Sequence, residues 1–371
     1  MIVEQGARGR ATAAAWAGGE HWRAARSRPP AGYRWERACP RPQGQLPQGQ
    51  LRPGRLLRAA LLAAGLFGLS PAQADERAFV TNQSAQTVSV VSLPQMAVLA
   101  TLPVSGKPAG VAAAPDGRHV YVSSPEGAFV TVLGTDPPAV LRQIALEGGP
   151  LGIAVHPSGK PLYVADWYAG RVFVVDPDSG ARLAELKTGD SPSGLAVSPD
   201  GSLLASADRD SDQVSLFSTA DHALIATVPT GARPFGIGFT PDGAHVLTTD
   251  VGADAVTVID VARRAVRTTV AVGERPYAVA FAGGRAFVTN QYAGTVSVID
   301  LATWTKIADV PTGEYPEGIA SAADGTSVYV ANWFDNSLVR IDVASLQVVG
   351  EARTGDGPRA FGQFIARVPA P

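Results

Sequence analysis

Short stretches in which apolar and polar residues alternate recur along the chain from about residue 75 onward. In "EGIASAADGTSVYVANWFDNSLVRIDVASLQVVGEAR", β-branched and aromatic residues alternate with small or polar ones between turns rich in Gly, Asp and Asn. A period of two predicts half-buried β-strands, and no stretch shows the 3.6-residue period of an amphipathic helix. The stretch therefore predicts four short strands joined by tight turns.

This four-strand unit repeats with a regular spacing. The residue that ends the second strand recurs at intervals of 42, with one interval of 40, at Asn82, Ser124, Asp166, Asp208, Asp250, Asn290 and Asn332. A proline before the first strand keeps the same spacing, at Pro108, Pro150, Pro192, Pro234, Pro276, Pro316 and Pro358. A period of 40–45 residues indicates a propeller or a solenoid, and four-stranded units favour the propeller. We expect an all-β, seven-bladed β-propeller of antiparallel blades over residues 75–371.

The order of the strands also predicts how the ring closes. The repeats begin on a second strand, "RAFVTN", and end on a first strand, "PRAFGQFIARV". The C-terminal strand should therefore complete the N-terminal blade, which removes an exposed sheet edge.

The first 74 residues are different in composition. Residues 1–50 are rich in Arg, Ala, Gly, Pro and Gln without apolar periodicity, which predicts either disorder or an extension upstream of the true start. Residues 51–74 contain a basic segment, a short apolar segment and "AQA", the pattern of a signal peptide cleaved after Ala74. A signal peptide lies close to its start codon, so we expect translation to begin near Leu46 or Leu51.

The twelve apolar residues of this segment are too few to cross a bilayer, which favours a signal peptide over a membrane anchor. Its removal would leave a periplasmic or secreted protein without a membrane span. The mature chain would lack cysteine, since Cys39 lies upstream. It would also be acidic: residues 1–74 hold eleven of the 31 basic and three of the 33 acidic residues, which leaves 20 basic and 30 acidic ones, a net charge of −10.

Motifs for catalysis or cofactor binding are missing from the sequence, so we expect neither a cofactor nor a metal. There is no HExxH, CxxC, GxSxG or phosphate-binding loop. "DRDSDQ" at residues 208–213 resembles the start of a calcium loop, but Gln213 and Thr219 stand where Gly and Glu are needed. An acidic turn is the better interpretation.

Comparison of the units with one another indicates where a ligand would bind. Positions that are the same in every unit build the blade, including the Asn, Asp or Ser that ends each second strand, whose side chain should bond the backbone two residues on. Positions that vary and carry large recognition groups lie in the loops after strands two and four, which emerge on one face. The candidate ligand-binding residues are Trp167, Arg209, Arg233, Phe235, Arg275, Tyr277, Gln291, Tyr315, Glu317, Trp333 and Arg359.

The repeats resemble a known family. "VYVAN", "LYVAD", "AFVTN", the "PDG" turns and the "TGxxPxGIA" connectors are similar to the YVTN-repeat, or YncE-like, propellers of bacteria, over residues 77–367. The resemblance implies export and a binding role, within a wider group that includes quinoprotein amine dehydrogenase heavy chains and seven-bladed lactonases.

Three functions are consistent with these observations. The first is a monomeric, non-catalytic binding or scaffold protein, whose partner is a small molecule or a periplasmic protein, as in an accessory to a periplasmic redox system. The second is a lactonase-type hydrolase that uses Glu317, Asp208 and Arg233, because propeller active sites leave no contiguous motif. The third is binding of single-stranded nucleic acid through Trp and Arg, which the negative charge disfavours.

Overall fold

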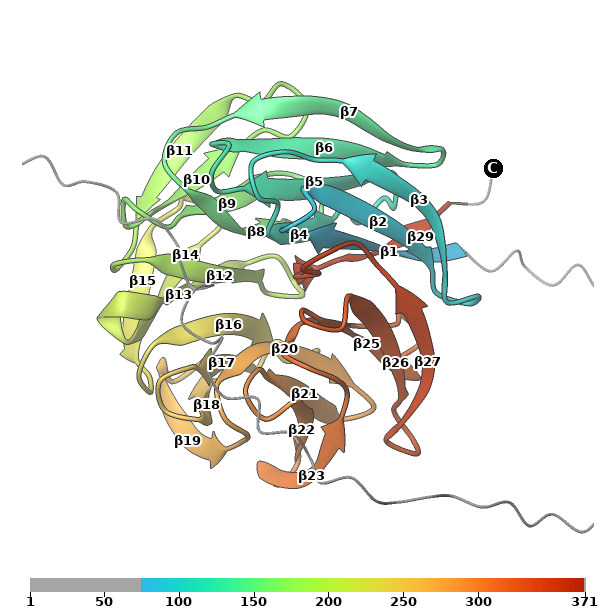
Figure 1. Cartoon of the computed structure of the whole chain (residues 1–371). Helices are drawn as coiled ribbons and strands as arrows, with labels where there is room; N and C mark the ends of the chain where they lie inside the picture. Colours follow the sequence, from blue (N-terminus) through green and yellow to red (C-terminus); the bar gives the residue numbers. More distant parts are fainter. Residues whose placement is uncertain (1–74, 370–371) are drawn as a thin grey trace, which may run out of the picture. The chain divides into compact units, whose positions relative to one another are not determined.

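The computed structural model describes residues 75–369. The predictions for residues 1–50 and for the signal peptide at residues 51–74 lie outside these residues. Residues 75–369 form seven β-sheets, each with four antiparallel strands, arranged as blades around a common axis (Figure 1), which confirms the predicted seven-bladed propeller. In this part of the chain no helix is long and apolar enough to cross a membrane.

The blades follow one another along the chain and are named A to G. Blade A contains β1 (Asp75–Asn82), β2 (Thr87–Ser92), β3 (Ala97–Pro103) and β29 (Ile365–Val368). Blade B contains β4 (Gly110–Ala113), β5 (His119–Ser124), β6 (Phe129–Thr135), β7 (Pro138–Ala145) and the additional β28 (Phe361–Gln363). Blade C contains β8 (Pro150–Val155), β9 (Leu162–Asp166), β10 (Arg171–Val175) and β11 (Arg182–Lys187).

The other four blades have the same order of strands. Blade D contains β12 (Pro192–Val197), β13 (Leu203–Asp208), β14 (Gln213–Ser218) and β15 (Leu224–Pro229), with a 3₁₀ turn η1 (Arg209–Ser211). Blade E contains β16 (Pro234–Phe239), β17 (His245–Asp250), β18 (Ala255–Asp260) and β19 (Ala265–Ala271). Blade F contains β20 (Pro276–Ala282), β21 (Arg285–Asn290), β22 (Thr295–Asp300) and β23 (Thr305–Pro311). Blade G contains β24 (Pro316–Ser321), β25 (Ser327–Asn332), β26 (Ser337–Asp342) and β27 (Gln347–Arg353).

The polar residue that ends each second strand is fully buried, and in several blades its side chain links the second strand to the third. Asn290 donates from Nδ2 to Thr295 and Ser297 on the third strand and accepts the amide of Gly273 in the connector. Asp166 makes the predicted bond to the backbone two residues on. The bonds thus extend further than predicted in these blades, whereas the Ser124 hydroxyl and the Oδ1 atoms of Asn82 and Asn332 have no hydrogen-bond partner among the described residues.

The C-terminal strand closes the ring as the sequence predicts. β29 pairs antiparallel with β1, from Asp75 opposite Val368 to Ala78 opposite Ile365, and the red end of the chain lies beside its blue beginning in Figure 1. The blade therefore gains its inner strand from residues that are far away in the sequence.

One detail of this closure was not predicted: blade A contains two additional residues in its inner strand. In blade D, Val197 is the fifth residue after the repeated proline, and it pairs with Leu204, four residues before the end of the second strand. In blade A, the residue that pairs with the equivalent position, Ala78, is Ile365, which is the seventh residue after the proline. The additional residues leave the blade at Gly362, where φ is +116°, a value that favours glycine. The additional length allows Phe361–Gln363 to form β28, which pairs in parallel with the free edge of β4 in blade B.

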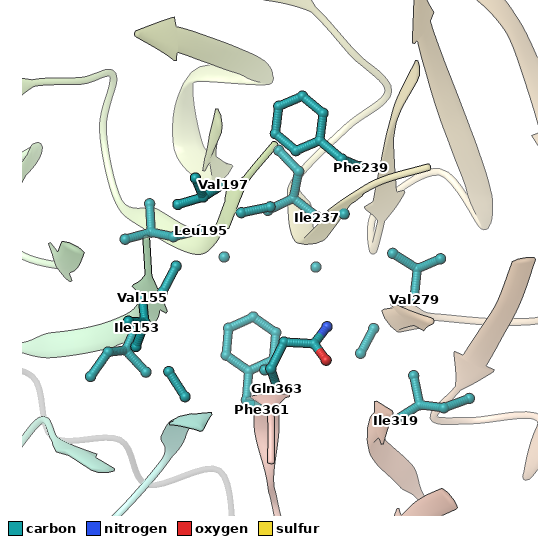
Figure 2. Close-up of a pocket in the computed structure, with 18 of the residues that line it drawn as sticks. Ile153, Val155, Leu195, Val197, Ile237, Phe239, Val279, Ile319, Phe361 and Gln363 are labelled. Carbon is teal, nitrogen blue, oxygen red and sulfur yellow. The ribbon is translucent and has the colours of Figure 1, made fainter. Parts of the chain in front are cut away.

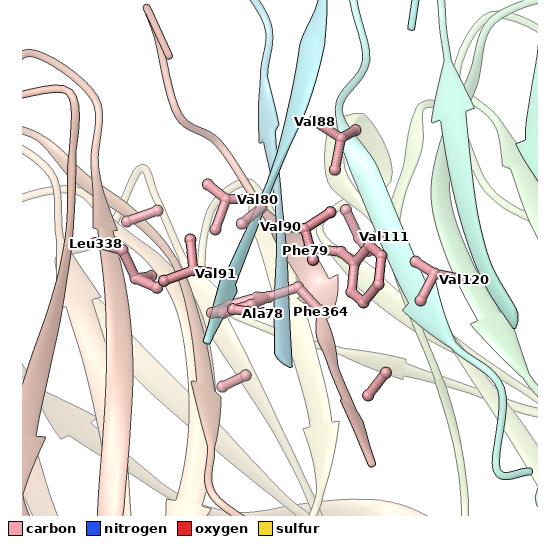
Figure 3. Packing of buried hydrophobic residues seen from close by; sticks show 14 of the residues in the cluster. Ala78, Phe79, Val80, Val88, Val90, Val91, Val111, Val120, Leu338 and Phe364 are labelled. Atoms are coloured by element: carbon pink, nitrogen blue, oxygen red, sulfur yellow. The ribbon is translucent and has the colours of Figure 1, made fainter. Parts of the chain in front are cut away.

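Buried apolar side chains fix the closing segment. Phe364 is fully buried in a cluster with Ala78, Phe79 and Val111, and Figure 3 shows this cluster between the neighbouring blades. The backbone amide of Phe79 donates to the carbonyl of Phe364 over 2.8 Å. The closure thus combines strand pairing with hydrophobic burial.

We predict that Phe364→Ala lowers the free energy of unfolding by about 3–5 kcal/mol, because the substitution leaves a cavity in the cluster that joins the two ends of the ring. Chemical denaturation of the purified protein measures this change. Phe334→Ala is the matched control: Phe334 is 62% exposed, so its substitution should change the free energy by less than about 0.5 kcal/mol. Equal losses in the two variants would contradict the assigned closure.

Candidate functional site

The loops after the second strands and the connectors between blades lie together on one face, called here the connector face. The amide of Trp167 donates to the carbonyl of Gly149, that of Gln291 to Arg275, and that of Trp333 to Tyr315. In each pair a turn residue meets the connector of its own blade. The turns between strands one and two, and between three and four, lie on the opposite face, called the hairpin face.

On the connector face three aromatic rings close the central axis. Phe235 and Tyr277 stack with their centroids 4.5 Å apart, and Phe361 lies 5.0 Å from Phe235 and 5.5 Å from Tyr277. All three are almost completely buried. Trp167 packs against Phe235 at 6.1 Å. We call Phe235, Tyr277 and Phe361 the aromatic plug.

A buried polar network covers this plug. Arg359 pairs with Glu317 at 3.0 Å, and its guanidinium also donates to the Tyr277 hydroxyl at 2.6 and 2.9 Å. Gln291 donates to the other carboxylate oxygen of Glu317 at 2.9 Å and accepts from Arg275 at 2.9 Å. Five of the predicted residues are therefore linked in one network.

Burial away from water shifts the pKa values of two residues in the network. Burial raises the pKa of Glu317 to about 7, although Arg359 and Arg275 oppose the shift. Glu317 Oε2 accepts no well-directed hydrogen bond from the described residues, so the carboxylate is poorly solvated. Burial also raises the pKa of Tyr277, which stays a neutral phenol. Glu317, Arg359, Tyr277 and Gln291 are thus buried in this network, whereas Arg275 is half-buried at its edge.

The other predicted residues surround the network. The Arg359 guanidinium lies 5.8 Å from the Trp333 ring, and the Arg209 guanidinium lies 5.5 Å from the Trp167 ring, at cation–π distances. Both Trp side chains are half-buried rather than fully exposed, as is Tyr315. Arg233 is exposed.

Three exposed aromatic residues on the connector face were missed by the sequence analysis. Tyr168, Tyr292 and Phe334 are 67%, 52% and 62% exposed, and they occupy the second position after the second strand in their blades. Tyr315 lies between two of them, 5.8 Å from Tyr292 and 5.1 Å from Phe334. We call Tyr292, Tyr315 and Phe334 the aromatic patch. The signal was present in the sequence as aromatics at one offset, one repeat apart in blades F and G.

Arg275 joins the patch to the network. Its guanidinium lies 4.8 Å from the Tyr292 ring and donates to the Tyr292 hydroxyl at 2.9 Å. The connector face thus combines exposed rings with a cation fixed by Gln291.

The acidic stretch at residues 208–213 has a structural role. Asp208 is fully buried and accepts hydrogen bonds from Ser206 and Ser215 and from the amide of Gly189. Within residues 75–369, His, Cys, Asp and Glu side chains do not gather in groups of three that could hold a metal ion.

The architecture defines the class of this protein as a seven-bladed propeller whose axis is closed at the connector face. The family model of the YNCE-like beta-propeller matches residues 176–365, and the chain belongs to that family.

Solved structures share the fold. The Kuenenia stuttgartiensis hydrazine synthase is 22% identical with a TM-score of 0.63, over 69% of this chain and 89% of that chain. A functionally unknown protein from Desulfotomaculum acetoxidans DSM 771 is 16% identical with a TM-score of 0.66, over 77% of this chain and 99% of that chain. No curated protein sequence matches the chain.

We predict that Glu317→Gln changes how stability depends on pH. The pKa of Glu317 rises from 4.5 to about 7 on folding, so the folded protein binds this proton more tightly than the unfolded chain. Its free energy of unfolding should therefore fall as the pH rises from about 4.5 to 7, by roughly 1–3 kcal/mol from this group. Glu317→Gln removes that part of the slope, which denaturation at several pH values measures.

The matched control is Glu314→Gln, which changes an exposed carboxylate in the same connector. This variant should keep the wild-type slope. A Glu317→Gln variant that also keeps it would show that Glu317 is already ionised well below pH 7.

Proposed function

We propose that this protein is an exported binding protein that holds a small molecule or a partner protein on its connector face. The observation that carries this proposal is the aromatic patch with Arg275 at its edge. Tyr292 and Phe334 are more than half exposed, although large aromatic side chains ordinarily contribute most when they are buried. Export is supported by the sequence of residues 51–74.

The composition of the patch suits recognition. Tyr, Trp and Arg dominate the residues on which binding free energy depends. The aromatic side chains bury a large area with only two rotatable bonds. Arg275 is held by Gln291 and Tyr292, so its guanidinium is ordered before a ligand arrives. Such preorganisation lowers the entropic cost of binding.

The contacts favour this function over a lactonase-type hydrolase. Glu317 is buried in its pair with Arg359, and Asp208 is buried among hydroxyl groups of its own blade. Arg233 lies exposed. The three residues are thus engaged separately, whereas a hydrolase needs them to act on one substrate.

Nucleic-acid binding is also less well supported. Arg359 is neutralised by Glu317 and Arg209 by Asp210. The net charge of −10 over residues 75–371 also disfavours binding to phosphates.

We predict that a double variant, Tyr292→Ser with Phe334→Ser, retains at least ten-fold less of the molecules that bind to the connector face. Its stability should be unchanged, because both side chains are exposed. The immobilised protein would be incubated with periplasmic extract of its native host, and retained proteins and small molecules would be quantified by mass spectrometry.

The control is Leu141→Ser with Leu183→Ser, which removes apolar residues of similar exposure, 53% and 59%, from the outer strands. It should retain the same molecules as the wild type. If both double variants retain them, or both lose them, the connector face is not the binding surface.

A further inference from the structure

A cavity of about 210 Å³ lies on the propeller axis, on the hairpin side of the aromatic plug. Its walls come from the inner strands of blades B to G, and Phe361 and Gln363 project into the ring of side chains that Figure 2 shows. Phe361 separates the cavity from the connector face, because its ring packs on Phe235 and Tyr277, which are both 4% exposed. The cavity is therefore closed at the connector end, and Pro199 of the β12–β13 turn lines its hairpin end.

Two layers of equivalent positions build the wall. The third residue after the repeated proline contributes Ile153, Leu195, Ile237, Val279, Ile319 and Phe361. The fifth residue contributes Ala113, Val155, Val197, Phe239, Phe281 and Gln363. Side chains two positions apart in a strand lie on the same face, so both layers face the axis.

The side chains of this wall are almost uniformly apolar, and the polar atoms of the backbone form much of the remaining surface. Among the described residues that line the cavity, Gln363 alone has a polar side chain. Leu195, Ile237 and Val197 are only half-buried, although they belong to the inner strands at the centre of the molecule. An apolar ligand would remove these surfaces from water, which is favourable in proportion to the area covered.

Gln363 reaches the axis because of the two additional residues in blade A. Before the chain reaches blade A, it forms β28, which pairs with β4 of blade B. This path brings Phe361 and Gln363 into the cavity together. An amide side chain both donates and accepts hydrogen bonds, so it can bind a hydroxyl or an N–H group.

We propose that this cavity binds a small aromatic molecule with one hydrogen-bonding group, whose ring lies between the two apolar layers and whose polar group meets the Gln363 amide. An apolar cavity of about 150 Å³ holds benzene, so the larger volume here suits one substituted ring. This site is separate from the connector face and does not depend on the function proposed for it.

The test uses p-cresol and toluene as probes, which differ by one hydroxyl group. Calorimetric titration of the purified full-length protein should show saturable binding of p-cresol, about ten-fold tighter than toluene. Gln363→Leu should remove this preference and leave toluene binding unchanged.

Ile237→Trp should abolish binding of both probes, because the larger side chain fills the cavity. Leu195→Phe fills it from the neighbouring blade and serves if the first variant does not fold. The Tyr292→Ser, Phe334→Ser double variant is the matched control and should bind p-cresol like the wild type, which separates this site from the connector face.

Three results would overturn the proposal. Absence of saturable binding by either probe shows that the cavity takes no such ligand. Binding that survives both filling variants shows that the probe binds elsewhere. Equal affinities for p-cresol and toluene, or a preference that persists in Gln363→Leu, refute the assigned polar contact and with it the class of ligand.

Discussion

The pairing of β29 with β1 is the interaction on which the rest of this propeller depends. Without it, β1 would have one neighbour and blade A would lack an inner strand. The residues before β29 are also hydrogen-bonded to β1. The amide of Arg359 donates to the carbonyl of Thr81 at 2.7 Å, and that of Ala360 donates to the Thr81 hydroxyl at 2.9 Å. A closed ring exposes only short outer edges, which protects a protein of this many strands from edge-to-edge association.

The same segment supplies the axis with its most distinctive side chains. Arg359 enters the polar network, Phe361 completes the aromatic plug and Gln363 lines the cavity below. Buried ion pairs contribute little net stability, but loss of one partner leaves a charge without solvation. Arg359 therefore couples ring closure to Glu317 and Tyr277 in blades G and F.

The sequence was sufficient to predict the blades, their number and the closing strand, because the 42-residue spacing and the period of two are repeated seven times. It was not sufficient for the path of β28. Phe361 occupies the position of Ile319 in the repeat, and nothing in that alignment shows that Gly362 adopts a positive φ and that the chain then pairs with β4. Such a path depends on the free edge of another blade, which only the assembled ring provides.

For the site, comparison of the repeats identified the connector face but not the environment of each residue. Glu317 and Arg359 vary between repeats as recognition residues do, yet they pair with each other and are buried. Residues from different blades converge near the axis, so a variable position there can find its partner within the protein. Tyr292 and Phe334 lie one position after Gln291 and Trp333 in their loops, and they remain more than half exposed.

The two ends of the axis differ because all inner strands run in the same direction. Each inner strand begins with its proline at the connector face and ends at the hairpin face, so the connectors are loops whose residues can vary from blade to blade. The third and fifth positions lie inside strands, and in most blades they carry apolar residues such as Ile153 and Val155, which belong to the packed core. The polar and aromatic variety of the connector face and the apolar uniformity of the cavity thus have one cause. The amide of Gln363 lines the cavity from β28, a strand that departs from the repeat to pair with β4.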